Sequence, residues 1–240
     1  MRLRAPGKHS GFTLRRLRRP RLTATAGRRR RAPSNPRTSG STRADHGFAR
    51  PGRPRRDRHA CEDDAEQIAG LQVAAWRAAY AGILPAAELH GLDTAALAGF
   101  WRGRIGAGTA AGAHVLVHDD GRRILGFSSF GPARDDDLGQ RRDVEELYAF
   151  YARPESWGTG VGRSLMRSTL SVWAERGTRA GYLWVLERNT RGRDFYRKGG
   201  WRQDPTAAPS GSGPDAVEIR YELTGIGTRP GGSAPRARRR

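Results

Sequence analysis

The sequence predicts an α+β domain, because helical and strand patterns follow one another in an order that packs helices against a sheet. Two helical stretches come first, a hairpin follows, and strand, helix, strand, helix and two closing strands complete the pattern. Two observations decide the class. The apolar run Val144–Ala152 suits a strand buried on both faces, and apolar residues from Val161 onward recur at helical spacing.

The first helix is predicted over Glu62–Tyr80, where apolar residues recur at helical spacing and acidic residues occupy the first turn. Gly82 and Pro85 end this helix. We expect its Trp76 to pack in the core, and a role for Tyr80 in lining a substrate cleft is the less favoured interpretation.

A second helical stretch covers Ala86–Arg104. Gly91-Leu92-Asp93 divides it, and Asp93 or Thr94 is expected to cap its second half. For Trp101, as for Tyr80, packing is favoured over a place in a substrate cleft.

A hairpin is predicted next, with strands at 113–118 and 123–130 on either side of Asp119-Asp120-Gly121. The polar residues 131–142 form the following loop. After the central strand and helix, Gly177 ends the helix.

Residues 181–186 (GYLWVL) predict a buried strand and residues 189–198 a short helix. Strands at 201–203 and 216–223 are expected to close the sheet around a loop at 205–214.

The turn between the central strand and its helix gives the first functional signal. Pro154 cannot donate to a sheet ladder, so the strand must end before it. Glycines at 158, 160 and 162 let backbone N–H groups point into one concavity, and the helix adds its own free N–H groups and positive dipole end. Such a site favours a phosphate or pyrophosphate, flanked here by Arg153 and Arg163. An ordinary tight turn is the alternative, since short glycine patterns are weak signals.

The basic charge of the chain lies in its ends. Residues 1–57 contain 18 of the 44 basic residues and 2 of the 24 acidic ones, residues 225–240 contain five Arg, and residues 58–224 retain 21 basic against 22 acidic residues. We therefore expect a folded domain at 58–224 between two disordered basic tails, 1–57 and 225–240. Residues 1–57 contain no continuous apolar segment of the kind that a secretory signal requires. A spurious N-terminal extension is the favoured interpretation of this tail, and a transit peptide or a nucleic-acid-binding arm is the alternative.

A single cysteine, Cys61, excludes an internal disulfide and a multi-cysteine metal site. His114 and His118 lie four apart, but on a predicted strand, where this spacing does not form a helical metal-binding pair. We therefore predict no metal, no membrane association and, by default, a cytoplasmic protein.

Three motifs in this order resemble the GNAT superfamily of N-acetyltransferases, over about residues 64–223. The family's acyl-CoA loop has the form Arg/Gln-x-x-Gly-x-Gly/Ala, and Trp157–Gly162 (WGTGVG) stands in that register with Trp157 in place of Arg or Gln. The lead-in LYAFYARP is typical of the family. Its last motif, Asn-x-x-Ala-x-x-Phe-Tyr-x-x-x-Gly-Phe, is similar to Asn189–Trp201, with Gly192 for Ala and Trp201 for Phe. The first helix further resembles a bacterial branch of small acetyltransferases.

The resemblance implies a mixed, mostly antiparallel central sheet flanked by helices, with two splayed central strands, Val144–Ala152 and Gly181–Leu186. It also implies acetyl-CoA as co-substrate, with pantetheine amides pairing along the freed strand and the pyrophosphate in the glycine loop. The cofactor-binding residues are then expected to be Phe150, Tyr151, Ala152, Trp157, Gly158, Thr159, Gly160, Val161, Gly162, Arg163 and Asn189.

The same resemblance implies two catalytic residues. Glu146 matches the register of a catalytic Glu and would deprotonate the attacking amine, with Glu145 on the opposite side of the sheet. Tyr196 resembles the family's general acid for the departing CoA thiolate, whereas Phe195 is expected in the core. A backbone N–H around residues 149–150 would polarise the thioester carbonyl. For Glu146 an ion pair with Arg is the alternative, and Asn189 either contacts the cofactor or caps its own helix.

The sequence thus predicts an acetyl-CoA-dependent N-acetyltransferase acting by direct transfer in a ternary complex. A basic-tailed nucleic-acid-binding protein and a non-catalytic acyl-CoA-binding module are the alternatives. The amine acceptor, small molecule or protein, stays open, as does a homodimer. Asp135-Asp136-Asp137 would suit a cationic amine, although an acidic loop is usually solvated.

Overall fold

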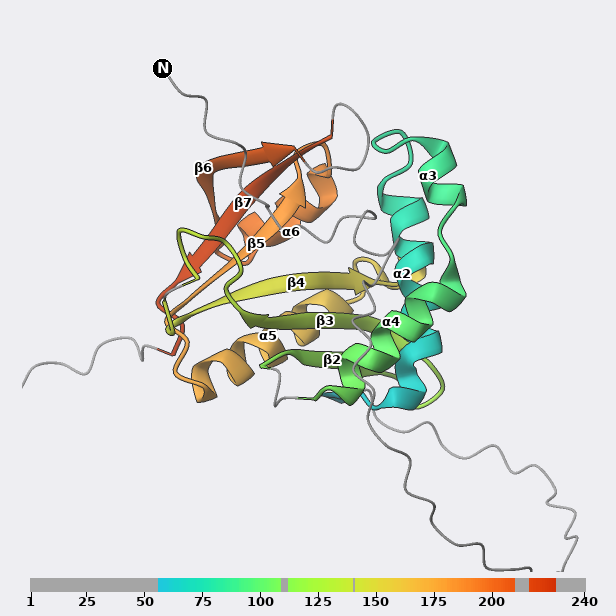
Figure 1. The fold of residues 1–240 in the computed structure, drawn as a ribbon, viewed down its shortest axis with the longest axis horizontal. Helices are drawn as coiled ribbons and strands as arrows, with labels where there is room; N and C mark the ends of the chain where they lie inside the picture. Colours follow the sequence, from blue (N-terminus) through green and yellow to red (C-terminus); the bar gives the residue numbers. More distant parts are fainter. Residues whose placement is uncertain (1–55, 109–111, 140, 210–215, 228–240) are drawn as a thin grey trace, which may run out of the picture.

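The computed structural model describes residues 56–108, 112–139, 141–209 and 216–227, which form one seven-stranded sheet with helices on both faces (Figure 1). The strand order is β1-β2-β3-β4-β5-β7-β6, and only the β4–β5 pair is parallel. This is the mixed, mostly antiparallel sheet that the sequence predicts. The strands are β1 (Arg56–His59), β2 (His114–Asp119), β3 (Ile124–Pro132), β4 (Val144–Ala152), β5 (Ala180–Leu186), β6 (Arg202–Pro209) and β7 (Val217–Thr224).

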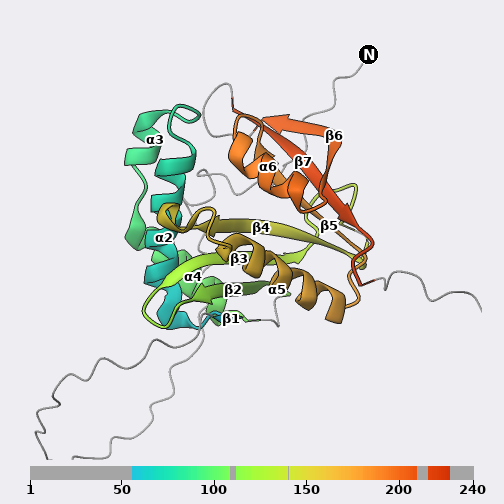
Figure 2. The ribbon, with the colours of Figure 1, turned by 180° about the vertical axis from the view of Figure 1, so that it is seen from behind.

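The helices divide between the two faces of the sheet. Figure 1 shows α2 and α4 in front of the sheet, and Figure 2 shows α5 and α6 on the opposite side. Their bounds are Ala65–Ala79 (α2), Ala86–His90 (α3), Thr94–Gly106 (α4), Val161–Glu175 (α5) and Thr190–Lys198 (α6), with 3₁₀ turns at Glu62–Asp64 (η1) and Pro154–Ser156 (η3).

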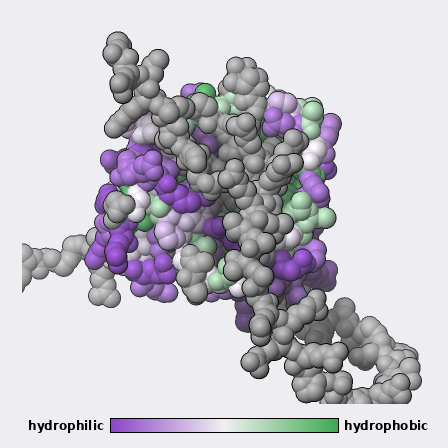
Figure 3. Space-filling model, viewed as in Figure 1, coloured by the Kyte–Doolittle hydropathy of each residue, from purple (hydrophilic) through white to green (hydrophobic). Residues whose placement is uncertain are grey.

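Each face has its own hydrophobic core. Ile68, Trp101 and Phe127 belong to the core under α2 and α4, and Trp173 and Tyr221 to the one under α5 and α6. Trp101 is fully buried and its indole N–H donates to Gln72 Oε1 at 2.8 Å, so its alternative placement in a substrate cleft is wrong. The described residues at the surface in Figure 3 are mostly hydrophilic, as expected when the apolar side chains fill these two layers.

Several predicted boundaries are confirmed because they follow from local chemistry. β4 spans Val144–Ala152, and α5 begins at Val161. Asp93 caps α4, since its carboxylate accepts hydrogen bonds from the N–H groups of Ala95 and Ala96.

The folded domain begins earlier than the predicted boundary at residue 58. β1 starts at Arg56 and pairs antiparallel with β2. Asp57 accepts hydrogen bonds from the Ser164 and Ser168 hydroxyls at 2.8 and 2.7 Å, and its other oxygen lies 2.6 Å from His118 Nδ1. The rest of the predicted N-terminal tail lies outside the described residues.

The C-terminal boundary also shifts. Ile226 is buried and its N–H donates to the carbonyl of Arg179, so residues 225–227 belong to the domain rather than to the predicted tail. Residues 228–240 lie outside the described part of the chain. β6 extends to Pro209, well into the predicted 205–214 loop, of which residues 210–215 are not described.

The two spaced histidines lie on β2, as predicted. His114 stacks on Phe130 at 5.2 Å, and burial lowers its pKa to about 4. Within the described ranges, no three His, Cys, Asp or Glu side chains gather closely enough to hold a metal ion. None of the helices described there combines the length and the apolar character that a membrane span requires.

Candidate active site

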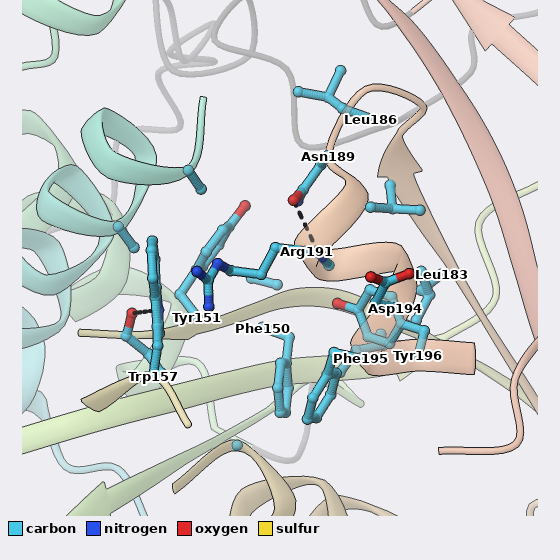
Figure 4. A pocket seen from close by; sticks show the side chains of 18 of the residues that line it. Phe150, Tyr151, Trp157, Leu183, Leu186, Asn189, Arg191, Asp194, Phe195 and Tyr196 are labelled. Carbon is cyan, nitrogen blue, oxygen red and sulfur yellow. Dashed lines mark hydrogen bonds between the residues drawn. The ribbon is translucent and has the colours of Figure 1, made fainter. Parts of the chain in front are cut away.

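The parallel pair β4–β5 separates halfway along its length. Cα partners run from Val144↔Ala180 to Leu147↔Leu183 and stop there, although β4 continues to Ala152 and β5 to Leu186. The separation opens into a cavity of about 850 Å³ between the strand ends, α2, α6 and the loop before α5 (Figure 4). The predicted splayed strands are therefore present, and a cavity lies between them.

A β-bulge directs the side chains of β4 at this point. Ser129 pairs with Ala149 and Phe130 with Leu147, so Tyr148 is the extra residue on β4. Beyond the bulge, no described residue pairs as a strand with the β5 side of β4, and the main chain of β4 borders the cavity. A ligand with amide groups can therefore add to this edge as a strand would.

The loop from Trp157 to Gly162 has the backbone that its glycines predict. Gly158 and Gly160 have φ values of +80° and +95°, which side chains other than glycine rarely adopt. The Thr159 hydroxyl donates to the Ser156 carbonyl at 2.8 Å and holds the turn, and α5 follows directly. The free N–H groups of the first turn of α5 and its positive dipole end thus lie at the cavity.

Most of the predicted cofactor-binding residues line the cavity. The exceptions are Thr159 and Val161, which do not line it, and Val161 packs in the core. Of the two flanking arginines, only Arg163 lines the cavity, because Arg153 donates to the Ile124 carbonyl instead. The lining includes Phe150, Tyr151, Ala152, Trp157, Gly158, Gly160, Gly162, Arg163 and Asn189.

Trp157 has a structural reason for replacing a polar residue. Its indole N–H donates to the Ala152 carbonyl at 3.0 Å, and the Arg191 guanidinium lies 4.5 Å from its ring centre (Figure 4). With Arg163 and Lys198, Arg191 supplies the positive charge of the cavity lining. No sequence pattern distinguishes Arg191 or Lys198 from the many other basic residues.

Glu145 and Glu146 face opposite sides of the sheet, as strand alternation predicts. Glu145 pairs with Arg176, the residue directly after α5, at 2.6 Å. Glu146 lies on the other side, where it accepts from Arg134 Nε at 2.8 Å and from the Tyr182 hydroxyl at 2.9 Å, and Arg134 Nη2 binds its second oxygen.

Glu146 lines the cavity but is only 2% exposed. Burial raises its pKa, and the hydrogen bonds from Arg134 and Tyr182 oppose that rise. The ion pair with Arg is thus present, and both carboxylate oxygens are engaged.

Phe195 and Tyr196 lie side by side on α6 with their rings at the cavity (Figure 4). Phe195 stacks on Phe150 at 5.4 Å and is only partly buried, so it forms a cavity wall as well as packing. Tyr196 is 9% exposed, and burial raises its pKa. Its phenol therefore holds its proton, as a proton donor must.

Asn189 caps α6, since its side-chain oxygen accepts from the Gly192 N–H at 3.0 Å. A Cβ at Gly192 would lie 2.7 Å from the Asn189 amide nitrogen. Glycine in place of alanine therefore leaves room for this cap.

Arg220 pairs with two carboxylates of the acidic loop. Asp135 is 6% exposed and accepts from the Trp184 indole N–H at 3.1 Å and from Arg220 at 3.2 Å. Arg220 also binds Asp137. Asp135 is therefore buried rather than solvated, whereas Asp136 and Asp137 are exposed, as expected for an acidic loop.

The sequence indicates little of the cavity wall opposite α6. Trp76 of α2, Tyr80 directly after that helix and Glu218 of β7 line this wall. Tyr80 thus borders the cavity, which was the less favoured interpretation of this residue. Glu218 alternates with the apolar Ile219 and Tyr221, which predicts a solvent-facing polar side for that strand. Only the tertiary fold places this side of β7 at the cavity.

The fold and this site define an acyltransferase built on splayed parallel strands. The Acetyltransferase (GNAT) family model matches residues 73–201, more than half of the chain. The chain belongs to this family and is an acyltransferase. It is 30% identical over 132 residues to an uncharacterized N-acetyltransferase, YuaI, of Bacillus subtilis (strain 168), covering 55% of this chain and 72% of that protein.

Three other proteins are also similar to this chain. An uncharacterized N-acetyltransferase of Archaeoglobus fulgidus is 36% identical over 73 residues, which cover 30% of this chain and 49% of that protein. The PaiA N-acetyltransferase from Thermoplasma acidophilum, in complex with coenzyme A, has a TM-score of 0.60 at 18% identity over 72% of this chain and 99% of that one. The yncA protein from Salmonella typhimurium, with its cofactor acetyl-CoA, has a TM-score of 0.54 at 18% identity over 72% and 94%. These two structures share the fold.

Proposed function

We propose that this enzyme transfers an acetyl group from acetyl-CoA to an amine by direct attack in a ternary complex. The observation that supports it best is the end of β4–β5 pairing at Leu147 and Leu183, which opens onto the cavity that the glycine loop also lines. An open strand edge next to a main-chain anion site matches a molecule that carries amides and a diphosphate. Two structures with this fold were solved with coenzyme A or acetyl-CoA.

The cavity residues fit such a co-substrate. The edge of β4 from Phe150 to Ala152 would hold the pantetheine amides, and the loop Trp157–Gly162 the pyrophosphate. Arg163, Arg191 and Lys198 would add positive charge near the phosphates. Acetyl-CoA supplies the acyl group as a thioester. A main-chain N–H near residues 149–150 would polarise its carbonyl.

Tyr196 is proposed to protonate the leaving thiolate. Its ring is at the cavity, and its buried phenol keeps its proton at neutral pH. Cys61, the single cysteine of the chain, lies on the surface away from the lining, which supports direct transfer without an acyl-cysteine.

Glu146 remains the proposed acceptor of the amine proton. Its raised pKa favours this role, because a base works best when its pKa is near the working pH. Its pair with Arg134 favours a structural role instead. The variant Glu146→Gln distinguishes a role as catalytic base from a structural role.

The test is calorimetric binding of CoA and acetyl-CoA, followed by a thiol-release assay over a panel of amines. Gly160→Glu adds a carboxylate to the loop at a position whose φ of +95° strains any residue with a side chain. CoA affinity is therefore expected to fall about 30- to 100-fold. Gly177→Glu is the matched control: its φ is +80°, and it lies at the far end of α5, outside the cavity lining. Absence of CoA binding by the wild type, or equal losses in both variants, would overturn the proposal.

A nucleic-acid-binding protein is the weaker candidate, because residues 58–224 are almost neutral and the basic charge lies in the ends of the chain. A non-catalytic acyl-CoA-binding module is distinguished by the same assay, since it would bind CoA and release no thiol with any amine.

A further inference from the structure

The cavity has a second wall that the co-substrate does not need. Its residues come from α2, the loop after it and the far ends of β4, β5 and β7. We call it the acceptor wall, and it consists of Trp76, Tyr80, Leu84, Tyr151, Leu186 and Glu218.

The aromatic part of the acceptor wall is fixed by ring contacts. Trp76 meets Tyr80 edge to face at 5.4 Å, and Tyr151 lies 6.3 Å from Trp76. Hydrogen bonds tie down the loop that carries Leu84, since its N–H donates to the Tyr80 carbonyl at 3.0 Å and Arg188 donates to the Gly82 carbonyl. The wall is therefore built before any ligand arrives.

Glu218 is the one carboxylate of this lining that lacks a partner among the described residues. Glu146 is paired with Arg134, and Asp194 with Arg197. For Glu218 the described chain provides neither an ion pair nor a hydrogen bond, and burial together with the nearby Glu146 charge raises its pKa to about 7. A half-buried carboxylate without a partner costs free energy that a bound cation would recover.

The positive charges of the cavity lie on the other wall. Arg163, Arg191 and Lys198 belong to α5 and α6, where the phosphates of the co-substrate are proposed to sit. Among the described lining residues, the acceptor wall adds apolar and aromatic surface and a carboxylate, but no Lys or Arg. Such a surface suits a cation with an apolar body, since ring faces also attract ammonium groups. The Glu218 carboxylate would repel a carboxylate on the ligand, because the two groups carry like charges.

Building on the proposed function, we propose that Glu218 binds the ammonium group of the acceptor. The acceptor is then a primary amine on an apolar or aromatic body, with no carboxylate on the carbon that bears the nitrogen. Amino acids that react at their α-amino group are excluded from this class.

The test compares matched probes. 2-Phenylethylamine and L-phenylalanine share the same aromatic body and differ by the carboxylate beside the amine, and 2-phenylethanol replaces the ammonium by a neutral hydroxyl. Each is titrated calorimetrically into the CoA-bound full chain and assayed for acetylation by thiol release. We expect 2-phenylethylamine to bind and react at least 10-fold better than the other two.

Glu218→Gln keeps the shape of the side chain and removes its charge. It should lower affinity and kcat/KM for 2-phenylethylamine about 10- to 100-fold, the usual effect of a charged hydrogen bond. CoA affinity should not change. Glu187→Gln is the matched control, since Glu187 is exposed, stands next to Leu186 and does not line the cavity. Unchanged CoA binding also shows that the variant is folded.

The outcomes separate the two proposals. A wild-type protein that binds no CoA refutes the proposed function itself. A protein that binds CoA but prefers L-phenylalanine or 2-phenylethanol, binds none of the three probes, or is unaffected by Glu218→Gln refutes the acceptor class alone.

Discussion

Replacing Arg134 by Met is expected to destabilise the domain strongly, because it leaves a buried carboxylate without a countercharge. Glu146 is 2% exposed, and two of its three side-chain hydrogen bonds come from Arg134. The third, from the Tyr182 hydroxyl at 2.9 Å, remains in the variant. A neutral hydroxyl cannot replace a guanidinium as the partner of a buried charge.

The magnitude follows from these contacts. Removing one partner of a buried ion pair costs about 3–5 kcal/mol. Loss of the Arg134 guanidinium from above the Tyr148 ring, 4.0 Å away, adds about 0.5–1 kcal/mol. Glu146→Gln keeps an acceptor for Arg134 and should cost about 1–3 kcal/mol. The double variant has no charge left at this pair. Its loss of unfolding free energy should therefore be about 2–3 kcal/mol smaller than the sum of the two single losses.

The assay is urea unfolding of the wild type, both single variants and the double variant, followed by circular dichroism at pH 7 and pH 5. With a urea slope of about 1–3 kcal/mol per molar, Arg134→Met should lower the midpoint by about 2 M. In this variant only the Tyr182 hydrogen bond still opposes the effect of burial, so the folded-state pKa of Glu146 rises further above its ordinary value. Stability tied to a raised carboxyl pKa is present at low pH and lost as pH rises, so the deficit should shrink from pH 7 to pH 5.

A loss below about 1 kcal/mol for Arg134→Met, or additive losses in the double variant, would refute this account of the pair. The same variants decide the role of Glu146 in the reaction. If Glu146 is the base, Glu146→Gln should lower kcat by about 10²- to 10⁴-fold in protein that is fully folded. If it only pairs with Arg134, kcat in the folded fraction should change little.

Four further outcomes are expected. Asp57→Ala, which removes the acceptor for two serines of α5 and the partner of a buried histidine, should cost about 2–4 kcal/mol in urea unfolding; a loss within 0.5 kcal/mol of zero, about the range of an ordinary surface substitution, would contradict it. Gly162→Ala puts a Cβ 3.2 Å from the Phe195 ring and should weaken CoA binding measured by calorimetry about threefold or more, roughly 0.7 kcal/mol, without loss of stability. Tyr196→Phe should lower kcat about 10-fold or more while leaving KM for acetyl-CoA unchanged. In the wild type, kcat/KM for 2-phenylethylamine should rise with pH through about 7, because Glu218 must be ionised, and Glu218→Gln should abolish this rise. The titratable groups that interact with Glu218 are Glu146 and Tyr151 of β4 and Tyr80, directly after α2.

Local sequence was sufficient where local chemistry fixes the backbone. The apolar run of β4, the following Pro154 and the glycine turn set the bounds of the strand and of α5 without any tertiary contact. Asp93 caps α4 for the same reason, since a cap acts within one turn of its helix. The family motifs belong to this class, and they predicted the glycine loop that lines the cavity.

Features made by distant contacts could not be predicted. β1 has the sequence Arg-Asp-Arg-His, which shows no apolar alternation, and it is held by main-chain pairing with β2 and by Asp57. The acidic loop is predicted to be solvated, yet its Asp135 is buried beside Arg220, eighty-five residues away. The alternation of residues along β7 predicts that Glu218 faces solvent, yet it lines the cavity.

The geometry of β4 explains how one cavity would hold both proposed ligands. Before the bulge, β4 pairs with β5 and directs Glu146 toward Arg134 and Tyr182; after it, the strand edge is open and Tyr151 faces Trp76 and Tyr80. Phe150 points the other way, onto Phe195 of α6. A co-substrate laid along the open edge would thus have α5 and α6 on one side and the acceptor wall on the other. Direct transfer requires this arrangement, because the amine must reach the thioester from a side that the co-substrate does not cover.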